Sequence, residues 1–116
     1  MRNFRKLDIW NLGMEIVDLV YELVKKLPRE ETYGLRSQMC KCVISMPSNI
    51  AEGCSRSSNK DFARFLEISI GSAFELETQI LAGNRIGHFT EEDIVNVIPK
   101  ILKFQKSTNA YRIKLL

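Results

Sequence analysis

The chain has 116 residues, the size of one domain, so we treat residues 1–116 as a single folding unit. Its 45% hydrophobic and 27% charged residues exclude a disordered or collagen-like chain. Its 17 basic and 14 acidic residues leave a charge of +3, which alone does not indicate a nucleic-acid-binding protein.

Apolar residues at helical spacing predict a first helix over about residues 8–27. Trp10, Val17 and Tyr21 belong to an apolar surface that spans roughly 220° of this helix, at 100° per residue. Pro28 ends the segment, because proline has no N–H to continue the helical hydrogen bonds.

A second helix is predicted to begin at Glu31 or Leu35 and to end at Gly53. We expect Gly53 to adopt the left-handed conformation that often follows a helix. Pro47 interrupts the apolar pattern, so a kink or a loosened turn is predicted there.

A third helix is predicted to follow Ser58, whose hydroxyl suits the N-cap position, with Asp61 three residues on. From Phe62 to Gly83 its apolar and small residues alternate spacings of four and three. This period is that of an amphipathic helix.

A fourth helix is predicted to start after Thr90, a good N-cap followed by three acidic residues that favour a helix N-terminus. Pro99 lies inside its apolar pattern and predicts a bend. No segment shows the period of a strand, and the connections are short. The sequence therefore predicts an all-α, antiparallel up-down-up-down four-helix bundle.

The first and third helices carry about twice the apolar surface that a small monomeric bundle buries. We therefore expect a homo-oligomer, although a monomer with a broad core and some exposed apolar residues also fits the pattern. The expected oligomer interface consists of Trp10, Val17, Tyr21, Phe65 and Phe74.

Arg36 and Glu77 fall on the apolar sides of the second and third helices. Since an isolated buried charge is costly, we expect a structural ion pair between them, within one chain or across a subunit interface. The polar face of the second helix is mostly uncharged and is a candidate partner-contact face, with solvent exposure as the alternative. Its candidate residues are Gln38, Ser45, Asn49 and Glu52.

Basic residues concentrate toward the two ends of the sequence, whereas residues 61–93 hold seven acidic and two basic residues. The polar segment 55–60 precedes a predicted helix N-terminus, where a phosphate can bind, although a capped polar loop is the favoured interpretation. Copies in an oligomer would multiply such contacts. The candidate nucleic-acid contacts are Lys41, Arg56, Lys60, Lys100, Lys103 and Lys106.

Enzymatic chemistry finds little support in the sequence. His88 is the one histidine and lies in a predicted turn with no serine or cysteine at a catalytic spacing, which leaves Glu77 as the other candidate acid or base. Three cysteines without a CxxC pair predict neither a disulfide framework nor a zinc site. We expect no enzyme activity, metal, cofactor or small-molecule substrate. Without a signal-peptide-like or membrane-spanning apolar run, we expect a cytoplasmic protein that does not contact membranes.

Taken together, residues 4–10, 33–38, 45–53, 60–66 and 71–78 resemble the four-helix-bundle proteins encoded in intervening sequences of bacterial 23S ribosomal RNA genes. The accessory variability determinant of diversity-generating retroelements is similar to the same proteins. This resemblance implies a homopentameric ring. For the retroelement members it also implies binding to a reverse transcriptase and to nucleic acid.

These observations favour a non-enzymatic, homo-oligomeric binding module. In the leading hypothesis its basic surface contacts RNA or an RNA-bound protein, such as a complex of RNA with reverse transcriptase. The alternative is a protein–protein scaffold or accessory subunit that binds no nucleic acid.

Overall fold

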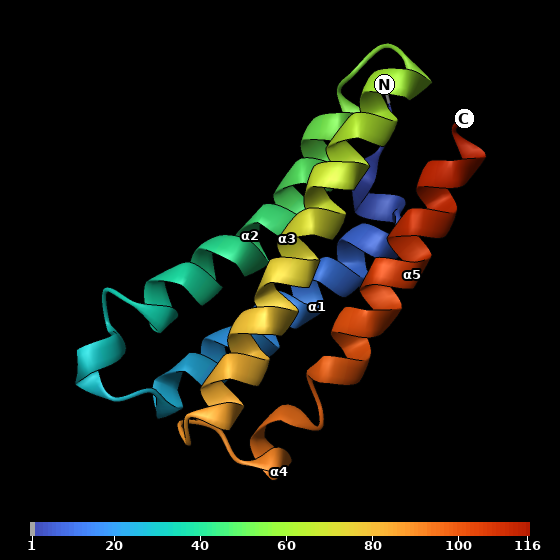
Figure 1. Cartoon of the computed structure of the whole chain (residues 1–116). Helices are drawn as coiled ribbons and strands as arrows, with labels where there is room; N and C mark the ends of the chain where they lie inside the picture. The colour runs from blue at the N-terminus through green and yellow to red at the C-terminus, as the bar shows by residue number, and fades with distance from the viewer. Residues whose placement is uncertain (1) are drawn as a thin grey trace.

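Four long helices and four short helical turns make up the protein (Figure 1). The computed structural model describes residues 2–116, which contain no strand. The predicted all-α four-helix bundle is confirmed. The elements are η1 (Phe4–Lys6), α1 (Asp8–Leu23), η2 (Val24–Lys26), η3 (Arg29–Glu31), α2 (Leu35–Cys54), α3 (Asn59–Arg85), α4 (Glu91–Ile94) and α5 (Ile98–Lys114).

Around the bundle the long helices follow the order α1, α2, α3, α5, and each packs against its two neighbours. The molecule is elongated, with extents of 44 × 24 × 19 Å. Every long helix contributes fully buried apolar side chains to one core, and burial of each stabilises the fold by about 1.5–3 kcal/mol. None of the described helices is both long enough and apolar enough to cross a bilayer.

Two predicted helix caps are present in the structure. The Ser58 hydroxyl accepts a hydrogen bond from the Asp61 N–H at the start of α3. Thr90 and Asp93 exchange side-chain and backbone hydrogen bonds in a reciprocal capping box before α4. These bonds satisfy N–H groups that a helix N-terminus leaves without partners.

The predicted fourth helix is wrong in one respect, because it does not run unbroken from Thr90. The chain forms the single turn α4, leaves the helical path, and begins α5 at Ile98. Pro99 lies in the first turn of α5 rather than in a helix interior. Proline fits this position without strain, since the first N–H groups of a helix have no helical partner.

Gly53 does not have the predicted left-handed conformation. It lies buried inside α2, which continues to Cys54, and the one positive φ in residues 2–116 belongs to Gly87. A Cβ built on Gly53 would lie 2.7 Å from a Phe62 ring atom and 2.9 Å from the Phe65 Cβ. The glycine is therefore needed for the close approach of α2 to α3. Pro47 is buried and does not interrupt α2.

A pair of glycine substitutions tests this packing. We expect Gly53→Ala to destabilise the fold by about 1–3 kcal/mol, because the added methyl group overpacks the α2–α3 contact. Gly71 is the matched control: it lies on the exposed side of α3 with no atom within 4 Å of a built Cβ. There alanine should stabilise the helix by about 0.5–1 kcal/mol. Urea denaturation measures both values, and equal stabilisation by the two substitutions would contradict this packing.

Glu31 connects the start of α2 with the turn after α3, at the end of the bundle opposite the N-terminus. One carboxylate oxygen accepts the Leu35 N–H at the start of α2, and the other lies 3.0 Å from Nε2 of His88 in the turn after α3. These two hydrogen bonds, that from Leu35 first, hold the pKa of Glu31 below its ordinary value of 4.5. His88 is thus placed in a structural contact.

The lowered pKa of Glu31 predicts a pH-dependent contribution to stability. The carboxylate stabilises the folded state fully above pH 4.5, and this contribution is lost as the pH falls through the lowered folded-state pKa. We expect Glu31→Gln to lower the free energy of unfolding at neutral pH and to approach the parent protein at acid pH, below the folded-state pKa of Glu31. Urea titrations at several pH values measure the difference. Glu30→Gln, at the exposed neighbour, should change nothing at either pH.

Candidate nucleic-acid interface

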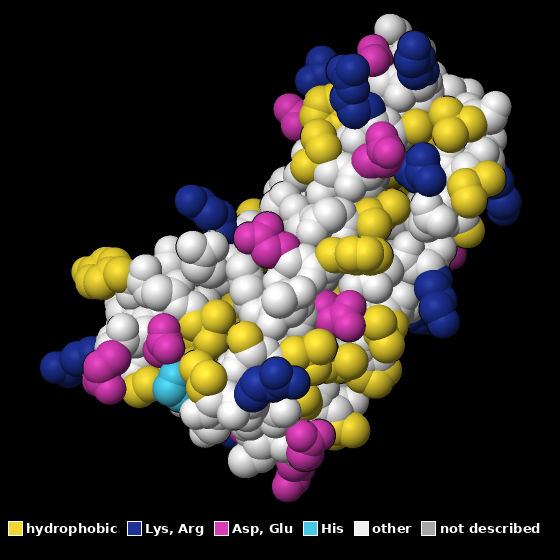
Figure 2. Space-filling view, in the orientation of Figure 1, with side chains coloured by type: hydrophobic (Ala, Val, Ile, Leu, Met, Phe, Trp, Pro, Cys, Tyr) yellow, Lys and Arg dark blue, Asp and Glu magenta, His cyan; other side chains and the backbone are white. Residues whose placement is uncertain are grey.

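Positive charge gathers at one end of the long axis. Because the bundle is antiparallel, the N-terminal segment, the α2–α3 connection and the end of α5 meet at this end (Figure 1). We call residues 2–7, 55–64 and 108–116 the basic end. It holds eight of the chain's seventeen basic residues and one of its fourteen acidic residues, and Lys and Arg side chains gather there in Figure 2. The basic residues are Arg2, Arg5, Lys6, Arg56, Lys60, Arg64, Arg112 and Lys114.

Arg2 attaches the N-terminal segment to the α2–α3 connection. Its guanidinium donates one hydrogen bond to the Arg56 carbonyl, at 2.9 Å, and another to Oδ1 of Asn59. The connection itself is shaped by Ser55, whose hydroxyl donates to the Glu52 carbonyl, and by the Ser58 cap. Segments more than fifty residues apart in sequence are thus held side by side.

Three arginines of the basic end lie over aromatic rings. The guanidinium carbons of Arg2, Arg5 and Arg56 are 4.5, 4.4 and 4.7 Å from the ring centroids of Phe62, Phe4 and Phe65, respectively. Such contacts are attractive, because the ring face carries partial negative charge. Two of the rings meet a further aromatic residue edge-on: Phe4 meets Trp10 and Phe62 meets Tyr111.

Of the six predicted nucleic-acid contacts, Arg56 and Lys60 lie at the basic end and are exposed. Lys41 lies on α2 and Lys106 within α5, outside the three segments, and both are exposed. Lys100 is 2.7 Å from Glu15 of α1 in an ion pair, so much of its charge is already neutralised.

Several basic-end residues were not among the predicted contacts, including Arg64 and Arg112. Their spacing along the sequence carries no sign of a common site. The signal that identifies them is the antiparallel topology, which brings the start of α3 and the end of α5 to one end of the bundle.

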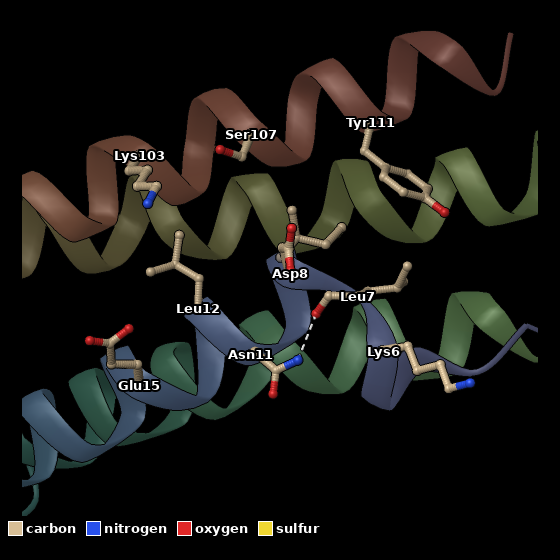
Figure 3. A pocket seen from close by; sticks show the side chains of 10 residues that line it. Lys6, Leu7, Asp8, Asn11, Leu12, Glu15, Lys103, Ser107 and Tyr111 are labelled. Carbon is tan, nitrogen blue, oxygen red and sulfur yellow. Dashed lines mark hydrogen bonds between the residues drawn. The ribbon is translucent and has the colours of Figure 1, made fainter.

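A groove of about 630 Å³ separates the first half of α1 from α5 (Figure 3). Asp8 and Leu12 point toward α5, while Lys103 and Tyr111 point back toward α1. The residues that line it include two basic ones, Lys6 and Lys103, and two acidic ones, Asp8 and Glu15, so this groove has balanced charges. It does not extend the positive charge of the basic end.

The predicted partner-contact face of α2 is only partly available. Ser45 and Ser72 share a hydrogen bond of 2.7 Å between α2 and α3, and the Asn49 amide donates to Ser45. These side chains are half-buried and bind each other, which explains the uncharged character of this face. Gln38 and Glu52 are exposed.

Within residues 2–116, Arg36 and Glu77 do not form an ion pair. Arg36 is exposed near the start of α2. Glu77 accepts a hydrogen bond of 2.8 Å from the Gln105 amide of α5. The predicted pairing within one chain fails because Glu77 faces α5 rather than α2, and its half-buried charge is stabilised by the neighbouring amide.

The predicted interface residues lie on more than one surface. Trp10, Val17 and Tyr21 lie on the side of α1 that borders α2. Tyr21 is close to Cys40 of α2, and burial together with this neighbour raises the pKa of Tyr21. Phe65 is half-buried beneath Arg56. The apolar strip beside α2, which we call the α1–α2 strip, consists of Trp10, Met14, Val17, Tyr21 and Ile44.

Phe74 belongs to a second apolar strip on the opposite side of the bundle. Phe74, Glu77 and Leu81 lie on one stripe of α3. Glu77 accepts a hydrogen bond from Gln105 of α5, and Leu102 lies one turn before Gln105, so this stripe faces Leu102. Figure 2 shows hydrophobic side chains over this face. Phe74, Leu81 and Leu102, which we call the α3–α5 strip, are 57%, 44% and 38% exposed.

Two of the three cysteines, Cys42 and Cys54, are buried. Burial raises the pKa of the Cys42 and Cys54 thiols, so both favour the protonated form. Among residues 2–116, no three His, Cys, Asp or Glu side chains gather as metal ligands would.

Comparison with known proteins agrees with this architecture. A crystal structure of a protein with unknown function, from the S23 ribosomal protein family of Bacteroides thetaiotaomicron, matches with a TM-score of 0.83 at 20% identity. The match covers 90% of this chain and 97% of that one, and it concerns the fold alone. No curated protein matches the sequence. The family model of the 23S rRNA-intervening sequence protein matches residues 5–110, and the chain therefore belongs to that family.

Proposed function

We propose that the chain is a non-enzymatic subunit of a homo-oligomer that binds RNA through its basic end. The observation that carries this proposal is the segregation of charge: the three segments that meet at one end of the bundle hold eight basic residues and one acidic residue. Glu52 and Glu67 border these segments, 3.7 Å from Arg56 and 3.9 Å from Arg112. Each phosphate neutralised by such a surface releases counterions, which favours binding. The family takes its name from intervening sequences of 23S rRNA genes, and this genetic context is the reason why RNA is the nucleic acid proposed here.

The two apolar strips support the oligomer. They lie on opposite sides of the bundle, because α1–α2 and α3–α5 are opposite edges in the helix order. When the α1–α2 strip of one copy covers the α3–α5 strip of the next, the contact is head-to-tail, and it closes into a ring when each contact turns the next copy by a whole fraction of a full turn. Five copies agree with the family resemblance.

Charge reversal at the basic end tests the binding of RNA. We expect Arg56→Glu/Lys60→Glu to weaken RNA binding at least about tenfold and to make its salt dependence shallower, because fewer phosphates are neutralised. Fluorescence anisotropy of a labelled RNA, titrated at several salt concentrations, measures both effects.

The matched control is Arg36→Glu/Lys41→Glu, which makes the same charge change at exposed positions outside the basic end. It should alter the affinity by less than about threefold, since salt screens distant charges. An affinity that does not depend on salt, or an equal loss in both variants, would refute binding through the basic end. Complete absence of RNA binding would instead favour the protein scaffold.

The mass of the protein in solution tests the assembly. Light scattering should give about five times the chain mass of 13.4 kDa for the parent protein. Phe74→Asp or Tyr21→Asp should reduce it toward one chain, because either carboxylate would be buried without a partner in the contact. Tyr33→Asp, at a site that is 95% exposed and outside both strips, should leave the mass unchanged.

Mixing the two disrupted variants tests the head-to-tail arrangement. Each retains one intact strip, so Phe74→Asp and Tyr21→Asp chains should form a complex of two chains when combined. Failure of the mixture to associate, while each single variant is folded, would rule out the pairing of these two strips.

A further inference from the structure

The arginines of the basic end fall into two groups. Arg2, Arg5 and Arg56 lie over phenylalanine rings, whereas no ring lies under Arg64 or Arg112 among residues 2–116. Binding of phosphates by charge alone would not require rings beneath the guanidinium groups. The phenylalanine rings under Arg2, Arg5 and Arg56 therefore point to a role for these arginines in addition to phosphate binding.

Arg5 and Arg56 are the two ring-supported arginines whose side chains remain exposed. Arg2, by contrast, is half-buried and uses its guanidinium to bind the Arg56 carbonyl and Asn59. The nearest carboxylate oxygen to Arg56 belongs to Glu52 and is 3.7 Å away, longer than a hydrogen bond. Both side chains thus combine an exposed position with a guanidinium carbon that lies over a phenylalanine ring.

An exposed guanidinium placed over a ring offers a planar group, or platform, on which a nucleic-acid base can stack. Arginine planes stack on unpaired bases, and the phenylalanine ring below restricts the side chain before the base arrives. We propose that Arg5 and Arg56 stack on unpaired bases and that the basic end thereby selects single-stranded RNA. This inference rests on the RNA-binding function proposed above.

The two platforms are close enough to act on one strand. The Arg2 side chain is bonded to the carbonyl of Arg56, and the Cα atoms of Arg2 and Arg5 are at most about 10 Å apart, so the two platforms lie on neighbouring, connected segments. Lys6 directly follows Arg5, and Lys60 lies in the first turn of α3, just after the connection that carries Arg56. Both lysines supply charges for the adjoining phosphates. Bases in a duplex are stacked and paired already, so they do not offer their faces to these residues.

The test separates base stacking from charge. The probes are labelled oligoadenylate and an abasic ribose-phosphate oligonucleotide of the same length and charge, with anisotropy as the readout. The parent protein should bind oligoadenylate at least about fivefold more tightly than the abasic strand. Arg5→Lys/Arg56→Lys keeps the charge but loses the planar group, so it should bring this ratio close to one and preserve the salt dependence.

The control variant is Arg64→Lys/Arg112→Lys, which makes the same change at basic-end arginines without a ring and should retain the parent ratio. Equal binding of the parent to both probes, or equal ratios for the two double variants, would overturn base stacking. In that case the loss caused by Arg56→Glu/Lys60→Glu would still support RNA binding by charge. If the parent binds neither probe nor any other RNA, the proposed function fails together with this inference.

Discussion

The close packing of α2 against α3 is the contact on which the rest of the structure depends. Gly53 lets the helices approach at the end where they are connected, and the buried Ser69 hydroxyl donates to the Met46 carbonyl at 2.7 Å further along. The Ser45–Ser72 hydrogen bond joins their outer edge. These contacts leave little freedom to the short connection between the helices, which carries Arg56. The position of the basic end thus follows from helix packing in the core.

Helix periodicity and capping residues are local features, and for this reason the sequence predicts most of the fold. Ser58 and Thr90 cap their helices as expected, because the bonds involved span three residues. The role of Gly53 and the break before Pro99 were predicted incorrectly. The role of Gly53 depends on the α3 side chains packed against it, and the break depends on where α5 begins. The apolar pattern of one helix contains neither kind of information.

The candidate site was harder to predict for a related physical reason. Arg56 and Lys60 were identified from a polar segment before a helix, which is a local signal. The contact between Arg2 and Phe62 was not identified, since these residues are sixty positions apart and meet only in the folded bundle. Likewise, the sequence indicates that the charge of Glu77 needs a partner but does not show which helix supplies it, so within one chain Gln105 of α5 was not foreseen.

The proposed assembly and the proposed RNA site also depend on each other geometrically. The apolar strips run lengthwise on opposite sides of the bundle, whereas the basic end lies at a tip of its long axis. In a cyclic ring every copy has the same orientation along the axis, so all basic ends lie on one face. A two-fold dimer formed across such strips can instead place the ends at opposite poles. Only the ring necessarily presents the basic ends together, and a strand that follows its face would meet them in succession.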